Sequence, residues 1–219
     1  MSMIISDDIS STGILNRKTR LVAFDIARAF AIILVVIGHW NPADAPVGWN
    51  DFVKWIYTFH MPLFLFISGY LFSRSDKSYK ALLISKIKRL LIPYLTVSII
   101  IITIKLLTSG NLSLENPVSA MSYIEILWKP SAGYFLWFIW TLWWCFCIVP
   151  LFKTRNSRIL LCCLCIVFSY IPLSLPDVFC LNETKRMMMW FIIGVLVMIS
   201  VQSLLWIQRR QQFVLPHYL

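Results

Sequence analysis

Arg28 and His39 are the residues whose types and spacing best suit chemistry, and both lie in the first apolar segment, LVAFDIARAFAIILVVIGHW. At about 100° per helical residue, eleven steps leave the two side chains within about 20° of one face and roughly 16 Å apart along the axis. Asp25 lies one turn before Arg28 on the same stripe. Because an ionised group in hydrocarbon costs at least about 2.5–3.5 kcal/mol, this stripe is expected to face a protein interior or a wet cavity. It is the leading candidate site.

A second imidazole, that of His60, lies early in the next apolar segment, in TFHMPLF. A short loop returns the chain to nearly the same depth, so His39 and His60 are expected in one neighbourhood. Imidazole can take a proton from a hydroxyl and return one to a leaving group, as acyl transfer requires. The alternative for His39 is an interfacial residue beside Trp40 in an aromatic belt.

Cationic side chains supply a second chemical property, the binding of anions. Arg28 would hold an anionic group that arrives from the cytoplasm, unless it snorkels to the inner surface or pairs with Asp25. Lys86 and Arg89 lie three apart on one face of a helix expected in SYKALLISKIKRLLIPY, with Lys88 and Arg74 nearby. Such a cluster usually signals only topology, but it is the only dense cationic pocket that the sequence offers a phosphate-rich cofactor.

The elements that position these residues are expected to be membrane spans. Apolar residues make up 59% of the 219 and charged residues 14%, whereas soluble domains are about 45–50% apolar. The expected fold class is all-α, a polytopic membrane helix bundle of about six transmembrane helices. The expected spans are 21–40, 52–72, 90–107, 134–152, 159–176 and 187–207.

Basic residues are concentrated in alternate connecting segments, which predicts a cytoplasmic amino terminus. The outer connections are then 41–51, 108–133 and 173–186. The net charge of +10 does not indicate nucleic-acid binding, because the Lys and Arg residues are not gathered on one soluble face. The predicted domains are a cytosolic tail at 1–20, a membrane domain at 21–207 and a cytosolic tail at 208–219.

Three further patterns concern packing. Five of the six cysteines lie inside apolar runs without the spacing of a zinc site, so neither a metal nor a disulfide is expected. Trp137, Trp140 and Trp144 share one helix face, for packing or for a groove that takes a lipid tail or sugar. Ser68 and Gly69 form a small patch at which another helix can approach closely.

Taken together, the segments resemble the integral-membrane acyltransferase family three, which includes fucose 4-O-acetylases and O-antigen acetylases of bacteria. The first matching segment is the most specific, because the family's first helix carries an Arg and a His with the spacing of Arg28 and His39. His60 matches the fucose-acetylase branch, in which HMPLF is typical. The matching pieces cover most of 21–200 in the family's order: FDIARAFAIILVVIGH, FHMPLFLFISGYLF, KIKRLLIPY, LWFIWTLWW and WFIIGVLV.

The resemblance implies that His39 is catalytic, that Arg28 helps to handle the acyl donor, and that this donor is acetyl-CoA. The family also has two arginines three apart at the inner edge of the third helix. Here Lys86 replaces the first and Arg89 is the second, so one position keeps its charge but loses bidentate geometry. Family members usually have about ten membrane helices, so a truncated product, a short variant that forms a homo-oligomer and an inactive remnant are all considered.

The expected function is a bacterial inner-membrane O-acetyltransferase that acts among membrane lipids. It would move acetyl from acetyl-CoA to a sugar hydroxyl of a cell-surface polysaccharide or a lipid-linked glycan precursor. Arg28, Lys86 and Arg89 would bind the phosphates of the donor, while His39, assisted by His60, promotes transfer. One alternative is a small transporter or channel with a polar path through Asp25, Arg28 and His39, and another is a non-catalytic membrane partner.

Overall fold

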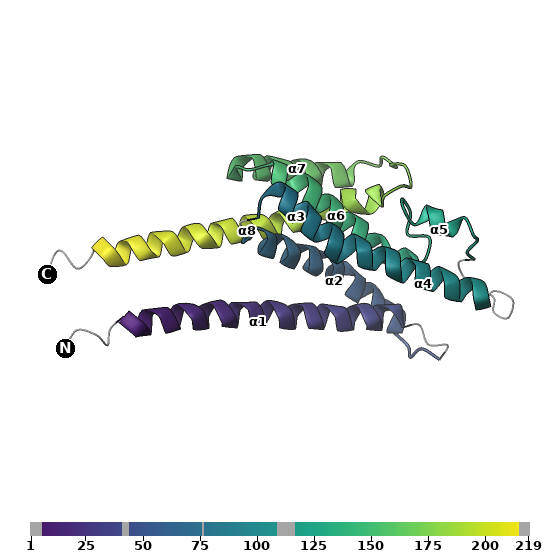
Figure 1. Ribbon diagram of the computed structural model, residues 1–219, viewed down its shortest axis with the longest axis horizontal. Helices are drawn as coiled ribbons and strands as arrows, with labels where there is room; N and C mark the ends of the chain where they lie inside the picture. Colours follow the sequence, from purple (N-terminus) through teal and green to yellow (C-terminus); the bar gives the residue numbers. More distant parts are fainter. Residues whose placement is uncertain (1–5, 41–43, 76, 109–116, 215–219) are drawn as a thin grey trace. The chain divides into compact units, whose positions relative to one another are not determined.

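The computed structural model describes residues 6–40, 44–75, 77–108 and 117–214, and these are arranged as helices joined by turns (Figure 1). The all-helical fold class is confirmed. Two compact units make up the chain, Met1–Ile67 and Ser68–Leu219. The helices are α1 (Ser6–His39), α2 (Trp49–Phe72), α3 (Tyr79–Lys86), α4 (Ile92–Thr108), α5 (Ser122–Glu125), α6 (Trp137–Ile148), α7 (Arg155–Tyr170) and α8 (Leu181–Val214), with a π-helical turn at Ile87–Leu91.

Within the described residues, four helical segments are long and apolar enough to cross a membrane: Val22–His39, Trp49–Phe72, Tyr79–Thr108 and Leu181–Gln208. They correspond to four of the six expected spans. The expected spans at 134–152 and 159–176 fall on the shorter apolar helix Trp137–Leu151 and on α7, which has 16 residues. The total of six spans and their orientation stay predictions.

In the first unit, α1 begins at Ser6, well before the expected boundary at residue 21. Its carboxyl-terminal end packs against α2, where a Cβ added at Gly38 would lie 3.6 Å from the Tyr57 ring. The Trp40 and Trp49 rings meet edge to face at 5.1 Å, and Trp49 Nε1 donates to the Trp40 carbonyl oxygen at 3.3 Å. These contacts join the facing ends of the two helices and gather aromatic rings beside His39, as in an interfacial belt.

In the second unit, α3 and α4 form one nearly continuous rod, interrupted only by the π-helical turn (Figure 1). The expected helix that leads into the third span is therefore present, and Ser78 caps it by accepting from the Ala81 amide at 3.4 Å. Pro93 has no amide hydrogen for the Arg89 carbonyl four residues earlier, and its ring crowds that carbonyl. The Ile92 amide accordingly bonds to Ile87, five residues back.

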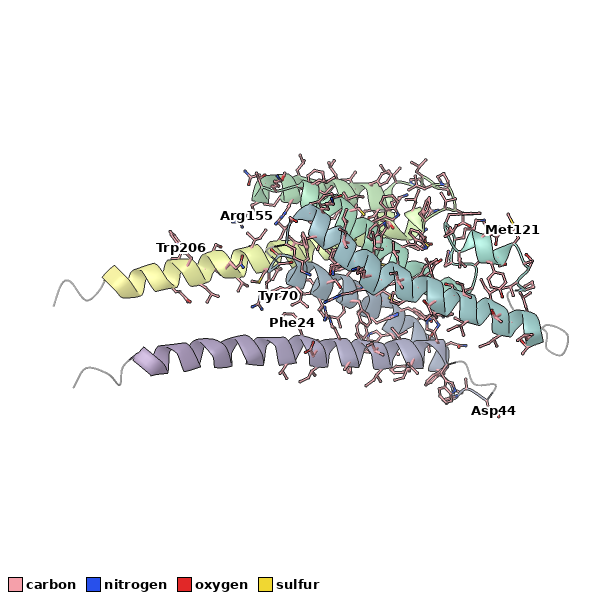
Figure 2. All side chains as sticks on the ribbon, in the orientation of Figure 1. Phe24, Asp44, Tyr70, Met121, Arg155 and Trp206 are labelled. Carbon is pink, nitrogen blue, oxygen red and sulfur yellow. The ribbon has the colours of Figure 1, made fainter. Side chains whose placement is uncertain are left out.

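The core of the second unit is centred on α8. Phe191 is fully buried, and the rings of Phe72 and Phe146 pack on it at 5.8 and 5.1 Å. A Cβ added at Gly69 would overlap the Phe191 carbonyl oxygen and lie 2.8 Å from its carbonyl carbon. The small patch predicted at Ser68 and Gly69 therefore does permit a close helix approach. Along the part of α8 beyond this core, apolar side chains are exposed; Trp206, labelled in Figure 2, has an exposed fraction of 56%.

Candidate functional site

The stripe of Asp25, Arg28 and His39 lies on one uninterrupted helix, so its expected spacing is retained. Arg28 is half-buried, whereas Asp25 and His39 are exposed. The most buried side of α1 carries Ala31 and Leu34, at 0% and 6% exposure, and lies roughly 90° around the axis from Arg28 and His39. Arg28 and His39 thus lie on the flank of the buried side of α1, whereas Asp25 lies roughly 150° around the axis from it.

Pairing of Arg28 with Asp25 was one alternative to a functional role. Among the residues whose side chains are described, the ion pair present joins Lys54 Nζ to Asp51 Oδ1 at 3.2 Å, and Arg28 forms none with Asp25. The guanidinium of Arg28 therefore remains able to meet an external anion.

Tyr57 on α2 contacts His39 and was not identified from the sequence. Its hydroxyl donates to the Gly38 carbonyl oxygen at 2.9 Å and lies 3.4 Å from His39 Nδ1. Because the only hydroxyl hydrogen is used on Gly38, the longer contact requires Nδ1–H of His39 as the donor. This arrangement favours the tautomer whose lone pair is on Nε2, the form of imidazole that can accept a proton.

His60 is fully buried one turn after Tyr57 on α2. Its Nδ1 lies 2.7 Å from the Ile56 carbonyl oxygen, so Nδ1 carries the hydrogen and Nε2 is an acceptor. That Nε2 is buried and has no hydrogen-bond partner among the described residues. A buried acceptor left unpaired costs about 1–3 kcal/mol, so it is a natural position for a ligand hydrogen.

The Tyr57 ring lies against both imidazoles. Its centroid is 6.1 Å from that of His39 and 5.1 Å from that of His60, edge to face in both cases. Both histidines therefore share one contact residue, in line with the neighbourhood expected for them. The spacing of Tyr57 and His60 on one helix was visible in the sequence and could have indicated their contact. The contact of Tyr57 with His39 joins two different helices, and spacing along one helix does not indicate it.

The cationic cluster belongs to the second unit. Lys86 is half-buried with Nζ 3.7 Å from the centroid of the Phe146 ring, a cation–π contact. Arg89 is exposed within the π-helical turn, whose larger turns spread it farther from Lys86 around the axis than an α-helix would. Arg74, just after α2, has a buried Nη1 with no hydrogen-bond partner among the described residues. A buried, unpaired guanidinium nitrogen suits an anionic ligand.

The indole face of α6 packs inside the second unit. Trp140 is 8% exposed and meets Tyr94 and Phe179 at centroid distances of 5.8 and 5.0 Å. Trp144 Nε1 donates to the Phe179 carbonyl oxygen at 3.2 Å. These contacts support the packing interpretation of the tryptophans over a lipid or sugar groove.

The described part of the chain contains neither a disulfide nor a cluster of metal-ligating side chains. Its six cysteines are free, and no group of three His, Cys, Asp or Glu side chains could hold a metal ion there. The predicted site residues therefore form two sets, the imidazole set with Asp25 and Arg28 in the first unit and the cationic set in the second.

Comparison with known proteins gives two kinds of match. The family model described as "Acyltransferase domain" matches residues 21–219. The nodulation protein NolL of Sinorhizobium fredii is 32% identical over 183 residues, covering 80% of this chain and 48% of NolL. NolL of Mesorhizobium japonicum is 31% identical over 156 residues, covering 64% of this chain and 38% of NolL. No solved structure matches the chain.

Proposed function

Because the chain belongs to the acyltransferase domain family, we propose that it is an O-acetyltransferase of the bacterial inner membrane. It transfers acetyl from acetyl-CoA to a sugar hydroxyl of a cell-surface polysaccharide or a lipid-linked glycan precursor. The chain spans about half the length of the curated relatives it matches, or less. The observation that carries the proposal is the pair of imidazoles around Tyr57, each with its Nδ1 positioned as a donor.

Proton transfer is the task of the imidazole set. His39, assisted by His60, takes the proton from the acceptor hydroxyl as that oxygen bonds to the thioester carbonyl carbon. The carbon–sulfur bond then breaks, and the proton passes from the imidazole to the sulfur of CoA. A lone pair on Nε2 is needed for the first step, and the Nδ1 contacts of both histidines favour it.

Donor binding is assigned to the cationic side chains Arg28, Lys86 and Arg89, which would meet the phosphates of acetyl-CoA. The buried Nη1 of Arg74, which has no hydrogen-bond partner among the described residues, supports this assignment for the second unit. Arg74 is thus the fourth cation of the proposed donor site. A guanidinium can hold two phosphate oxygens at once, so Arg74 can compensate for the bidentate geometry that Lys86 lacks.

Replacing Arg74 with glutamine is expected to raise KM for acetyl-CoA about 10- to 100-fold, the effect of losing a charged hydrogen bond worth about 1.5–3 kcal/mol. The kcat should change little, because Arg74 binds the donor and moves no proton. Arg155→Gln is the matched control, because Arg155 is exposed at the start of α7. Equal KM values for the two variants would remove Arg74 from the donor site.

Replacing Tyr57 with phenylalanine is expected to lower kcat about 2- to 10-fold, from the loss of one hydrogen bond worth about 0.5–1.5 kcal/mol. KM should hold, and the pH profile of kcat should shift, because Tyr57 positions His39 and touches no substrate. Tyr79→Phe is the control, because it loses a similar bond, from Tyr79 Oη to the Cys147 carbonyl oxygen at 3.0 Å. An unshifted pH profile would mean a purely structural role for Tyr57.

The acceptor can be tested in the source organism. Mass spectrometry of surface glycans from a deletion strain should show the loss of O-acetyl groups, restored by the wild-type gene and not by the His39→Ala variant. Unchanged glycan acetylation in the deletion strain would contradict the proposed function.

A further inference from the structure

A polar cavity of about 310 Å³ lies in the second unit, between the turn that contains α5 and the loop that joins α7 to α8. Met121, labelled in Figure 2, marks the start of the α5 turn. Both segments belong to the outer connections of the predicted topology, as does the loop after His39. The polar side chains that line the cavity are Ser122, Glu125, Lys129, Ser131, Asp177 and Glu183.

The α5 wall of the cavity is held in place by a hydrogen-bonding side chain of α4. The Tyr94 hydroxyl lies 2.8 Å from the Ile126 carbonyl oxygen and 3.0 Å from that of Lys129, and its one hydrogen is shared between these two acceptors. The Phe179 amide donates to the Trp128 carbonyl oxygen at 2.6 Å, which ties the second wall to the first. The cavity therefore has a fixed shape before any ligand enters, a condition that lowers the entropic cost of binding.

The opposite wall is fixed by two side chains of α8. Lys185 is 9% exposed, and its Nζ donates to the carbonyl oxygens of Ile171 and Leu173 at 2.6 and 2.8 Å. The Asn182 side chain accepts from the Leu175 amide at 2.9 Å and donates to its carbonyl oxygen at 3.0 Å. The loop between α7 and α8 is thus bonded to the helix that follows it.

Hydrogen-bonding capacity remains on the cavity wall. Ser122 is 6% exposed, and its Oγ accepts from the Ser119 amide at 3.1 Å but donates to no acceptor among the described residues. Ser131 Oγ donates to Glu125 Oε2 at 3.1 Å, which leaves Oε1 of that carboxylate for another donor. The wall therefore offers both a buried donor and a carboxylate acceptor, the combination that a sugar hydroxyl needs.

The charge of the cavity selects against anions. Three carboxylates, those of Glu125, Asp177 and Glu183, face one ammonium, that of Lys129. Burial, with Glu183 and Asp177 nearby, raises the pKa of the Cys180 thiol to about 12, so this thiol stays neutral at physiological pH. The net negative field disfavours phosphates, including those of acetyl-CoA, while a neutral polyol can use carboxylates, hydroxyls and ammonium alike.

We propose that this cavity binds one neutral sugar residue of the acceptor glycan. Glu125 and Asp177 accept hydrogen bonds from its hydroxyls, and Ser122 and Lys129 donate to its oxygens. A volume of about 310 Å³ is at the small end for ligand pockets and accommodates one sugar ring rather than an extended cofactor. This inference rests on the proposed function for the identity of the glycan as acceptor.

The test is saturation-transfer NMR on the full chain in nanodiscs, with methyl glycosides of glucose, galactose and fucose as probes and glucose 6-phosphate as the anionic comparison. Saturation transfer to at least one neutral glycoside is expected, with weaker transfer to the phosphate. Asp177→Asn should weaken glycoside binding at least tenfold, and exposure of Asp177 makes this variant compatible with folding. Asp51→Asn, at an exposed acid of α2, is the control and should bind as the wild type does.

The inference would be overturned if no neutral glycoside showed saturation transfer. It would also be overturned if Asp177→Asn and wild type bound the glycosides equally well. Binding needs no acetyl-CoA, so the two proposals fail separately. Glycoside binding that depends on Asp177 without acetyl transfer would leave the sugar site standing and remove the proposed function. If the chain transfers acetyl and the acceptor KM is the same in Asp177→Asn and wild type, the proposed function stands and the sugar site is removed.

Discussion

Replacing His39 with alanine is expected to lower acetyl transfer by about 10²- to 10⁴-fold, the usual contribution of a positioned acid–base group. The side chain is exposed at the end of α1, so its removal should leave insertion and folding intact. The measurement is the rate of acetyl transfer from acetyl-CoA by membranes that contain equal amounts of wild-type and variant protein.

Two comparisons sharpen this result. His60→Ala should lower the rate less than His39→Ala if His60 only assists, and the double variant should be no slower than His39→Ala. Acid quenching of the wild-type reaction separates a proton-accepting His39 from one that carries the acetyl group, because only the carrier forms labelled acetyl-imidazole. Wild-type activity in His39→Ala would exclude both roles.

Replacing Gly69 with alanine is expected to destabilise the second unit by at least about 1–3 kcal/mol, the usual range for overpacking. The added Cβ would overlap the Phe191 carbonyl oxygen. This oxygen is a backbone atom of a helix, so it cannot move away by a change of rotamer as a side-chain atom can. For a chain of this size the loss corresponds to a fall in Tm of roughly 2–12 °C. Thermal unfolding of the detergent-solubilised protein measures it.

Gly38→Ala provides the matched control for this stability measurement. A Cβ at Gly38 would make ordinary contacts, 3.6 Å from Tyr57 and 3.7 Å from Ile56. Because alanine also favours the helix by about 1 kcal/mol over glycine, this variant should be as stable as the wild type or more so. Equal Tm values for the Gly38 and Gly69 variants would contradict the close approach of α2 and α8.

Features that depend on one helix could be predicted from the sequence. The spacing of Arg28 and His39 follows from helical periodicity alone, and α1 retains it. The small patch at Gly69 was recognisable because only residues without large side chains allow two helix backbones to meet. The apolar runs likewise identified the four longest helices, although not where each one ends.

Helix ends differed from the expected spans for local chemical reasons. The span expected at 159–176 is interrupted because Ile171 precedes Pro172 and adopts extended backbone with ψ 125°, so α7 ends at Tyr170. In the opposite direction, α8 continues to Val214, past the boundary expected at residue 207. Hydropathy averages over a window and does not register a single proline.

Contacts between elements could not be predicted in the same way. Tyr57 meets His39 across two helices, and nothing in either helix alone specifies the partner. The polar cavity is lined by both Glu125 and Asp177, which are far apart in the chain. No local sequence motif could therefore predict it. Sequence patterns fix which face of a helix a residue occupies, whereas packing decides what that face meets.

Transfer of radiolabel from acetyl-CoA to a neutral glycan by the purified chain in proteoliposomes tests the proposed activity in a single measurement. An O-acetyltransferase should place alkali-labile label on the glycan, at a rate that saturates with both substrates and collapses in His39→Ala. A chain that leaves every offered glycan unlabelled, and instead passes solute or protons without acetyl-CoA, would be a transporter and would contradict the enzymatic assignment.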